Sequence, residues 1–187
     1  MVDWGKIKDD VERQITTLHE ELGWFNDEEL SNTPRRIVEF YKEWVKNNDV
    51  VYTTFSVAQE SMIVLKSIDY YSLCAHHLLP FFGKVDIAYL PYPKGKIVGV
   101  SKLARAVVKI ASKPQTQEYM TSQIAEELWR ELSPAFLLVK VEGQHLCMMM
   151  RGIKQHQSLM RTEAMKMVKE KKQFVTSLKT EALDLMK

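Results

Sequence analysis

The hydrophobic pattern of the chain changes its period near residue 50, and this change limits the folds that the chain can adopt. Before residue 50, apolar side chains recur every three or four positions among charged ones, as in a helix with one buried face; the first series is Ile7, Val11, Ile15, Leu18 and Leu22. A second series follows Thr33-Pro34, an N-cap with proline at the first helical position, and ends at Asn47-Asn48. We therefore predict two helices within residues 1–48.

After residue 50, the sequence favours strands. β-branched and aromatic residues, or apolar residues that alternate with polar ones, predict strands in three segments, at 50–55, 61–71 and 84–89. A shorter strand is expected at 97–100. Further along the chain, the segments 136–141 and 144–150 predict a hairpin that turns around Gly143.

Helical patterns return between and after these strands. One helix is expected directly after residue 100 with Ser101 as its N-cap, and a second over about 116–132, ending before Ser133-Pro134. Residues 161–187 are rich in Lys and Met at helical spacing, which indicates a helical tail. The predicted fold class is α+β, with an N-terminal helical region (1–48) and a domain (49–187) in which two helices pack on one face of an antiparallel sheet.

Composition narrows the class of protein. Of the 187 residues, 45% are hydrophobic and 27% are charged, which provides enough apolar material for one buried core. The 26 basic and 24 acidic residues nearly balance, so we expect neither a protein that coats nucleic acid nor one that binds an acidic membrane. No apolar stretch approaches the ~20 residues that span a bilayer, and no export signal is visible, so a cytoplasmic location is expected.

The two cysteines carry the main chemical signal. In the cytoplasm Cys74 and Cys147 would stay reduced, which leaves a free thiol, a metal ligand or a nucleophile as interpretations. Cys74 and His77 lie three residues apart, close enough for one turn of chain to direct both side chains at a single ion. That spacing alone is also typical of a buried cysteine near surface histidines.

His145 and Cys147 strengthen the metal interpretation. They lie two apart in a predicted strand, so we expect them on one face, which Met149 and Arg151 continue. Two thiolates and one imidazole form a zinc site whose fourth position is open to water, as in catalytic sites. A closed structural site would need a fourth ligand, which a remaining histidine could supply, and spacing alone leaves both kinds of site open. The methionines at 148–150 are expected to pack in the strand and core and not to bind metal.

Four motifs occur in order along the chain: CAHHLLPFFGK at 74–84, GVSKLAR at 99–105, KPQTQE at 113–118 and HLCMMMRG at 145–152. TPRR at 33–36 precedes them. In sequence and spacing this set resembles the GTP cyclohydrolase I family, which has the tunnelling fold. The resemblance implies a tunnelling-fold catalytic domain in residues 49–187. It also implies an enzyme that converts GTP and water to formate and 7,8-dihydroneopterin triphosphate.

The resemblance further implies roles for individual residues. These are zinc binding by Cys74, His77 and Cys147, catalysis by His76 and His145, recognition of guanine by Gln117 and Glu118, and binding of the triphosphate by Arg36, Lys102, Arg105 and Arg151. GTP is then the expected partner, with no nucleic acid and no membrane. A homo-oligomer is also implied, in the family a ring of ten subunits with active sites at the subunit interfaces.

The chain departs from the usual family sequence at three places. Ala75 stands where Glu is usual, Lys113 where Arg is usual, and residues 157–163 where a Ser/Thr-rich strand is usual. Two alternative functions therefore stay open. One is a related tunnelling-fold enzyme that only opens the purine ring or acts on another pterin or deazapurine. The other is a non-catalytic, zinc-stabilised module that binds a purine.

Overall fold

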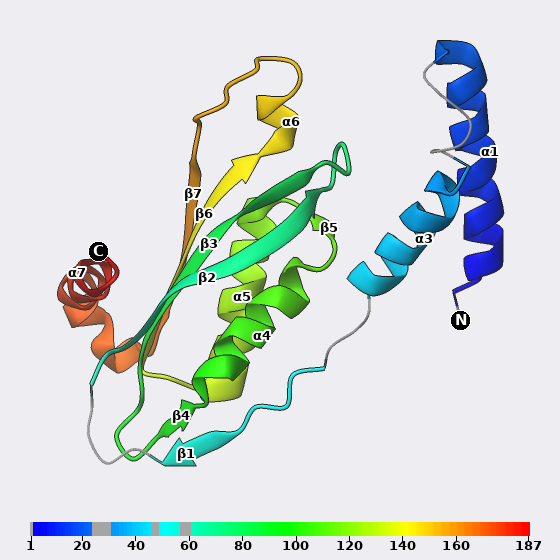
Figure 1. Ribbon diagram of the computed structural model, residues 1–187. Coiled ribbons are helices and arrows are strands. Elements are labelled where there is room, and N and C mark those ends of the chain that lie inside the picture. The colour runs from blue at the N-terminus through cyan, green and yellow to red at the C-terminus, as the bar shows by residue number, and fades with distance from the viewer. Residues whose placement is uncertain (1, 24–30, 46–48, 57–60) are drawn as a thin grey trace. The chain divides into compact units, whose positions relative to one another are not determined.

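The computed structural model describes residues 2–23, 31–45, 49–56 and 61–187 (Figure 1). The chain divides into two compact units, residues 1–47 and 48–187, which we describe separately. Within the described residues, no helix is both long enough and apolar enough to cross a membrane.

The first unit consists of two helices that pack on each other, α1 (Trp4–Leu22) and α3 (Thr33–Trp44). The Asp3 carboxylate caps α1 by accepting a hydrogen bond from the backbone N–H of Lys6, and α1 ends at Gly23 in the left-handed conformation. Both predicted helices are confirmed. Asn32, not Thr33, precedes the first residue of α3. The predicted end of this helix, at residues 47–48, lies outside the described residues.

The second unit contains a five-stranded sheet in the order β5-β2-β3-β6-β7. Its four longer strands pair antiparallel: β2 (Ile63–Cys74), β3 (Pro80–Leu90), β6 (Phe136–His145) and β7 (Met160–Met167). The short strand β5 (Pro114–Gln115) runs parallel to the end of β2. A separate two-stranded sheet pairs β1 (Thr54–Ser56) with β4 (Lys96–Val98), so the strand expected at 50–55 is reduced to its last part.

Two helices cover one face of the five-stranded sheet, α4 (Val100–Ala111) and α5 (Gln117–Leu132) (Figure 1). Alternate residues of β2, β3 and β6 point toward these helices and form the main core, which includes Tyr70, Phe81 and Val139. The predicted α+β fold, with two helices on one face of an antiparallel sheet, is confirmed. The segment after β7 forms a 3₁₀ helix, η1 (Lys169–Phe174), and then α7 (Val175–Leu185).

The α7 helix packs away from α4 and α5. Its residue Ala182 is buried in a second, smaller cluster with Phe136 and Leu138 from β6. The helical tail predicted for 161–187 is therefore correct only in its second half, because residues 160–167 form β7 and complete the sheet beside β6. Strand pairing with β6 overrides the helical spacing of this segment.

Two further expectations were wrong. The N-cap of α4 is Gly99, and Ser101 lies inside the helix. The segment 136–150 is not a hairpin, because β6 continues without a turn to His145 and a short helix, α6 (Leu146–Met149), follows. Gly143 pairs with Gly83 on one side and with Met160 on the other, and pairing on both sides holds it extended.

Candidate metal centre and active site

The end of β2 places Cys74 beside two histidines. The chain reverses after Cys74 in a turn in which the Cys74 N–H donates to Leu79 O at 2.8 Å and the Leu78 N–H donates to Cys74 O at 2.8 Å. Leu78 adopts a positive φ of 54°, which completes the reversal into β3. The turn brings Nδ1 of His77 to 3.7 Å and Nδ1 of His76 to 3.8 Å from the Cys74 Sγ atom.

The strand β5 holds this turn in place. The backbone N–H of Ala75 donates to Gln115 O at 3.1 Å. The buried Gln115 side chain in turn donates to Ile110 O at 2.7 Å and to the Ser72 hydroxyl at 3.2 Å. These contacts link the end of α4 to the loop that carries the histidines. Ala75 itself is exposed, so the departure from the usual glutamate disturbs no packing in this chain.

Cys147 completes a group of three ligand atoms. One ligand atom from each of Cys74, His77 and Cys147 lies within 4.8 Å of the other two. The expectation that His145 and Cys147 project from one strand face was wrong, because the strand ends at His145 and Cys147 belongs to α6. The helical turn of α6, and not strand alternation, brings the thiol toward Cys74.

The methionines beside Cys147 do not form the core that was expected. Met148 and Met150 are 38% and 59% exposed, because α6 lies beyond the end of the sheet. Met149 and Arg151 likewise continue no strand face, since neither lies in a strand.

The donor set suits a borderline-soft divalent metal. Two thiols and one imidazole are ligands that favour zinc over magnesium or calcium. Burial raises the pKa of the Cys147 thiol, and the neighbouring Cys74 raises that pKa further. Charge repulsion disfavours two adjacent thiolates, and a bound cation would relieve it, so the arrangement fits a metal site.

His145 directly precedes α6, two residues before Cys147, and its ring has a fixed orientation. Its ring stacks on Phe81 with the ring centroids 4.7 Å apart and an interplanar angle of 5°. Its Nε2 atom lies 2.9 Å from Oε1 of Gln117. Burial lowers the pKa of His145, and the nearby Glu118 carboxylate opposes this shift. The half-buried ring is therefore favoured in its neutral form.

The two residues expected to recognise guanine point in different directions. Both follow Thr116, whose hydroxyl caps α5 by accepting from the Tyr119 N–H. Gln117 is fully buried under the sheet, and its amide nitrogen donates to groups of this chain, at Val141, Met160 and Thr162. Glu118 is exposed in the first turn of α5 and is close enough to influence His145. Of the pair, Glu118 is the side chain that is accessible to a ligand.

Comparison with known proteins decides the family. The family model described as GTP cyclohydrolase I matches residues 7–186. The chain belongs to the GTP cyclohydrolase I family. Three relatives named GTP cyclohydrolase 1 illustrate the similarity. That of Carboxydothermus hydrogenoformans is 39% identical over 94% of this chain and 91% of its own length. That of Brevibacillus brevis is 37% identical over 96% of this chain and 97% of its own length. That of Streptococcus pyogenes is 46% identical over 69% of this chain and 69% of its own length.

Among solved structures, the apo crystal structure of the archaeosine synthase QueF-Like is similar at a TM-score of 0.45 and 15% identity. The match covers 58% of this chain and 95% of that one.

The cations that the GTP cyclohydrolase I resemblance assigns to the triphosphate are spread over the chain. Arg151 lies at the metal group, where its Nη1 contacts Nε2 of His77 at 2.8 Å. Lys102 and Arg105 lie in the first half of α4, and Ala111 at its other end is three residues before β5. With a rise of 1.5 Å per residue, Lys102 is roughly 13 Å along the axis from Ala111. Arg36 is exposed on α3 in the first unit.

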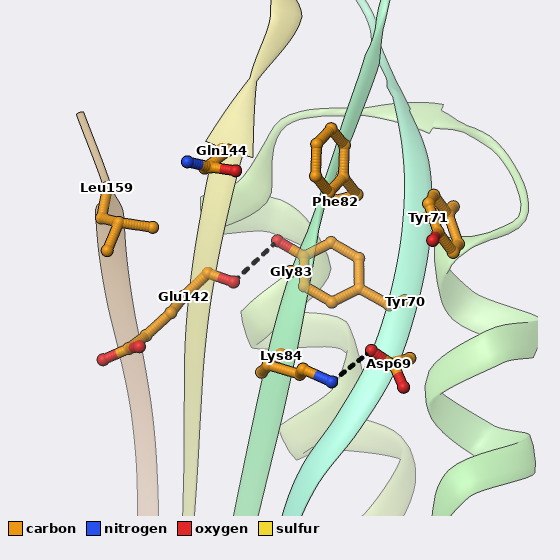
Figure 2. Close-up of a pocket in the computed structure, with 9 residues that line it drawn as sticks. All are labelled: Asp69, Tyr70, Tyr71, Phe82, Gly83, Lys84, Glu142, Gln144 and Leu159. Atoms are coloured by element: carbon orange, nitrogen blue, oxygen red, sulfur yellow. Dashed lines mark hydrogen bonds and ion pairs between the residues drawn. The ribbon is translucent and has the colours of Figure 1, made fainter. Parts of the chain in front are cut away.

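A separate hollow of about 250 Å³ lies on the sheet away from α4 and α5 (Figure 2). Its walls include Tyr71 and Phe82, which stack with their centroids 5.8 Å apart and alternate with residues that face the helices. Lys84 and Asp69 form an ion pair at its edge. The hollow contains none of the residues assigned to metal, histidine chemistry or GTP.

Three residues around His145 were not identified from the sequence. Phe81 supports the ring, Thr162 accepts from Gln117, and Gly143 leaves room for the Gln117 amide. Phe81 and His145 are partners across β3 and β6, so their contact depends on strand register. The only available signal was Gly143, which the sequence associated with a turn.

Proposed function

We propose that this protein is a zinc-dependent GTP cyclohydrolase I that converts GTP and water to formate and 7,8-dihydroneopterin triphosphate. The observation that carries the proposal is the convergence of Cys74, His77 and Cys147 within 4.8 Å, with an oriented His145 two residues from Cys147, in a chain of this family. Zinc held by these three residues would polarise a bound water and lower its pKa toward ~7. The protein's own side chains supply proton transfer and substrate binding.

His76 and His145 are the proposed proton-transfer residues. A histidine accepts and donates protons near neutral pH because its unperturbed pKa is ~6.5. His145 is held between Phe81 and Gln117, which limits its motion during the reaction. His76 is exposed beside Cys74 and can reach a ligand without rearrangement of the core.

Glu118 is the proposed recognition group for guanine. Its carboxylate can accept the two adjacent N–H groups on the guanine edge, and its position in the first turn of α5 keeps it exposed. Gln117 precedes Glu118 in the same KPQTQE motif, and we propose that it contributes to catalysis through its contact with His145. Together the two residues would link guanine recognition to the histidine that acts on the ring.

Arg151 connects the metal group to the triphosphate. Its guanidinium can contact His77 Nε2 only while that nitrogen carries no proton, because guanidinium only donates. An imidazole that gives Nδ1 to a metal keeps its proton on Nε2. Zinc binding through Nδ1 would therefore release Arg151, whose planar donors suit phosphate oxygens.

We further propose that the active unit is a homo-oligomer, a ring of ten as in the family, with sites at subunit interfaces. The position of Lys102 near the start of α4, roughly 13 Å along the axis from the end that leads to β5, supports this, because a neighbouring copy could supply a cation closer to the metal group. So does β7, which ends the sheet with an unpaired edge in the described residues. Residues 49–187 are the proposed catalytic domain, and Arg36 is proposed to bind the triphosphate on the family resemblance alone. Sedimentation that showed a fully active monomer would contradict the assembly.

The cytoplasm is the proposed location, because thiolate ligands stay reduced there. The deciding assay incubates zinc-loaded protein with GTP and measures formate and, after oxidation, fluorescent pterin. Both products are expected. Formate without pterin would indicate a relative that only opens the purine ring, and GTP binding without either product would indicate a non-catalytic module. Protein stripped with a chelator and then reloaded with zinc is the matched control for metal dependence.

A further inference from the structure

Gln117 joins His145 to a closed network beneath the sheet. Its Oε1 lies 2.9 Å from Nε2 of His145. On the other side of the amide, its Nε2 lies 3.1 Å from Met160 O and 3.3 Å from Val141 O. The side chain is 0% exposed, so these protein groups, and not solvent, determine how the amide is oriented.

The two backbone carbonyls determine which way the amide faces. Carbonyl oxygens only accept hydrogen bonds, so the group that faces Met160 O and Val141 O must be the amide NH₂. A flipped amide would put its own oxygen against both carbonyls, and three acceptors would then face one another without a donor between them. The Gln117 oxygen therefore faces His145, and the proton between them belongs to Nε2 of His145.

Two threonine hydroxyls close the network in the same direction. The Thr121 hydroxyl donates to Gln117 O at 2.7 Å. It lies 2.6 Å from the Thr162 hydroxyl, which must then donate to Thr121. The Thr162 hydroxyl has then used its one proton and can only accept a further hydrogen bond. It accepts from the Gln117 amide nitrogen, which lies 3.1 Å away. Every donor in the network thus has a consistent direction, and the two N–H bonds of the Gln117 amide are shared among three acceptors.

The backbone leaves space for this arrangement at one position. A Cβ atom on Gly143 would lie 2.5 Å from Gln117 Oε1 and 2.4 Å from the Tyr70 hydroxyl. No side chain fits there while the amide reaches His145. The ring of His145 is held on its flat side by Phe81, so hydrogen bond and stacking together define its orientation.

We infer that Gln117 is a positioning residue that holds His145 in the tautomer with its proton on Nε2, so that Nδ1 is the nitrogen that exchanges a proton with substrate. Because Oε1 of Gln117 only accepts hydrogen bonds, it keeps the proton on Nε2 of His145 and leaves Nδ1 as the nitrogen available to substrate. The inference rests on the proposed role of His145 in the conversion of GTP.

The test is a direct measurement of the tautomer. Zinc-loaded, full-length protein with ¹⁵N-labelled histidine is studied by long-range ¹H–¹⁵N correlation NMR, and the His145 signals are assigned by their loss in His145→Gln. We expect a protonated Nε2 and an unprotonated Nδ1. Gln117→Met keeps the length of the side chain and removes its oxygen, and should shift the His145 tautomer ratio by about tenfold. Turnover of GTP should fall about tenfold or more, with zinc content unchanged.

Gln115→Met is the matched control, because Gln115 is also buried and hydrogen-bonded but has no contact with His145 in the described structure. It should lower stability and leave the His145 tautomer unchanged. A wild-type protein with the proton on Nδ1 of His145 would overturn the inference, as would a folded Gln117→Met protein with an unchanged tautomer. A protein with the expected tautomer that releases no formate would instead contradict the proposed function and support the network.

Discussion

Substitution of Gly143 by alanine should destabilise the protein and disturb His145 at the same time. The added Cβ would lie 2.4 Å from the Tyr70 hydroxyl and 2.5 Å from Gln117 Oε1. Carbon and oxygen atoms in contact are usually about 3.5 Å apart, so one side must move by roughly 1 Å. Neither neighbour can move into solvent, because Tyr70 is 1% and Gln117 0% exposed.

The loss of unfolding free energy in Gly143→Ala has two parts. Overpacking of a close-packed core costs about 1–3 kcal/mol. If the Gln117 amide is displaced, the buried groups that it leaves unpaired add about 1–3 kcal/mol. We expect a combined loss of about 2–5 kcal/mol in the free energy of unfolding, since neighbouring effects do not add fully. For a chain of this size that loss lowers the unfolding temperature by roughly 5–15 °C.

Thermal and denaturant unfolding of the zinc-loaded protein, at one subunit concentration, measure this loss. Gly99→Ala is the matched control in the same unit, because its Cβ would meet nothing closer than Lys102 Cγ at 3.8 Å. As the N-cap of α4 it should cost only about 0.5–1 kcal/mol. An unfolding temperature for Gly143→Ala within about 2 °C of the wild type would refute the reasoning, since Tyr70 and Gln117 would then not be fixed against the strand.

Three further predictions concern the proposed site. Cys147→Ser should lose bound zinc and activity together. Met148→Leu, a variant of the exposed neighbouring residue, should keep both. Metal analysis that finds Cys147→Ser fully loaded with zinc would disprove the ligand assignment. Glu118→Ala should lower kcat/KM for GTP by about 10–150-fold with zinc retained; unchanged kinetics would place guanine elsewhere. Ala75→Glu should change kcat by less than about tenfold, or 1.4 kcal/mol of barrier, whereas a thousandfold rise in formate release would show that the missing carboxylate is essential.

The sequence alone determined which segments bury a face and which residue types are available for chemistry. Amphipathic spacing predicted α1, α3 and α4, β-branched and aromatic residues predicted β2, and alternating residues predicted β3. The Cys74–His77 spacing also led to two of the three metal-group residues, because one turn of chain joins them. These are local properties, decided by side-chain periodicity and by short chain connections.

Tertiary structure decided the features that depend on strands distant in sequence. Pairing of Gly143 with Gly83 and Met160 kept β6 straight where glycine suggested a turn, and pairing with β6 made residues 160–167 a strand. The same register placed Phe81 under His145 and opened the space at Gly143 for the Gln117 amide. Local propensity cannot specify such contacts, because a strand's neighbours, and so the groups opposite each side chain, are chosen by the packing of the whole sheet.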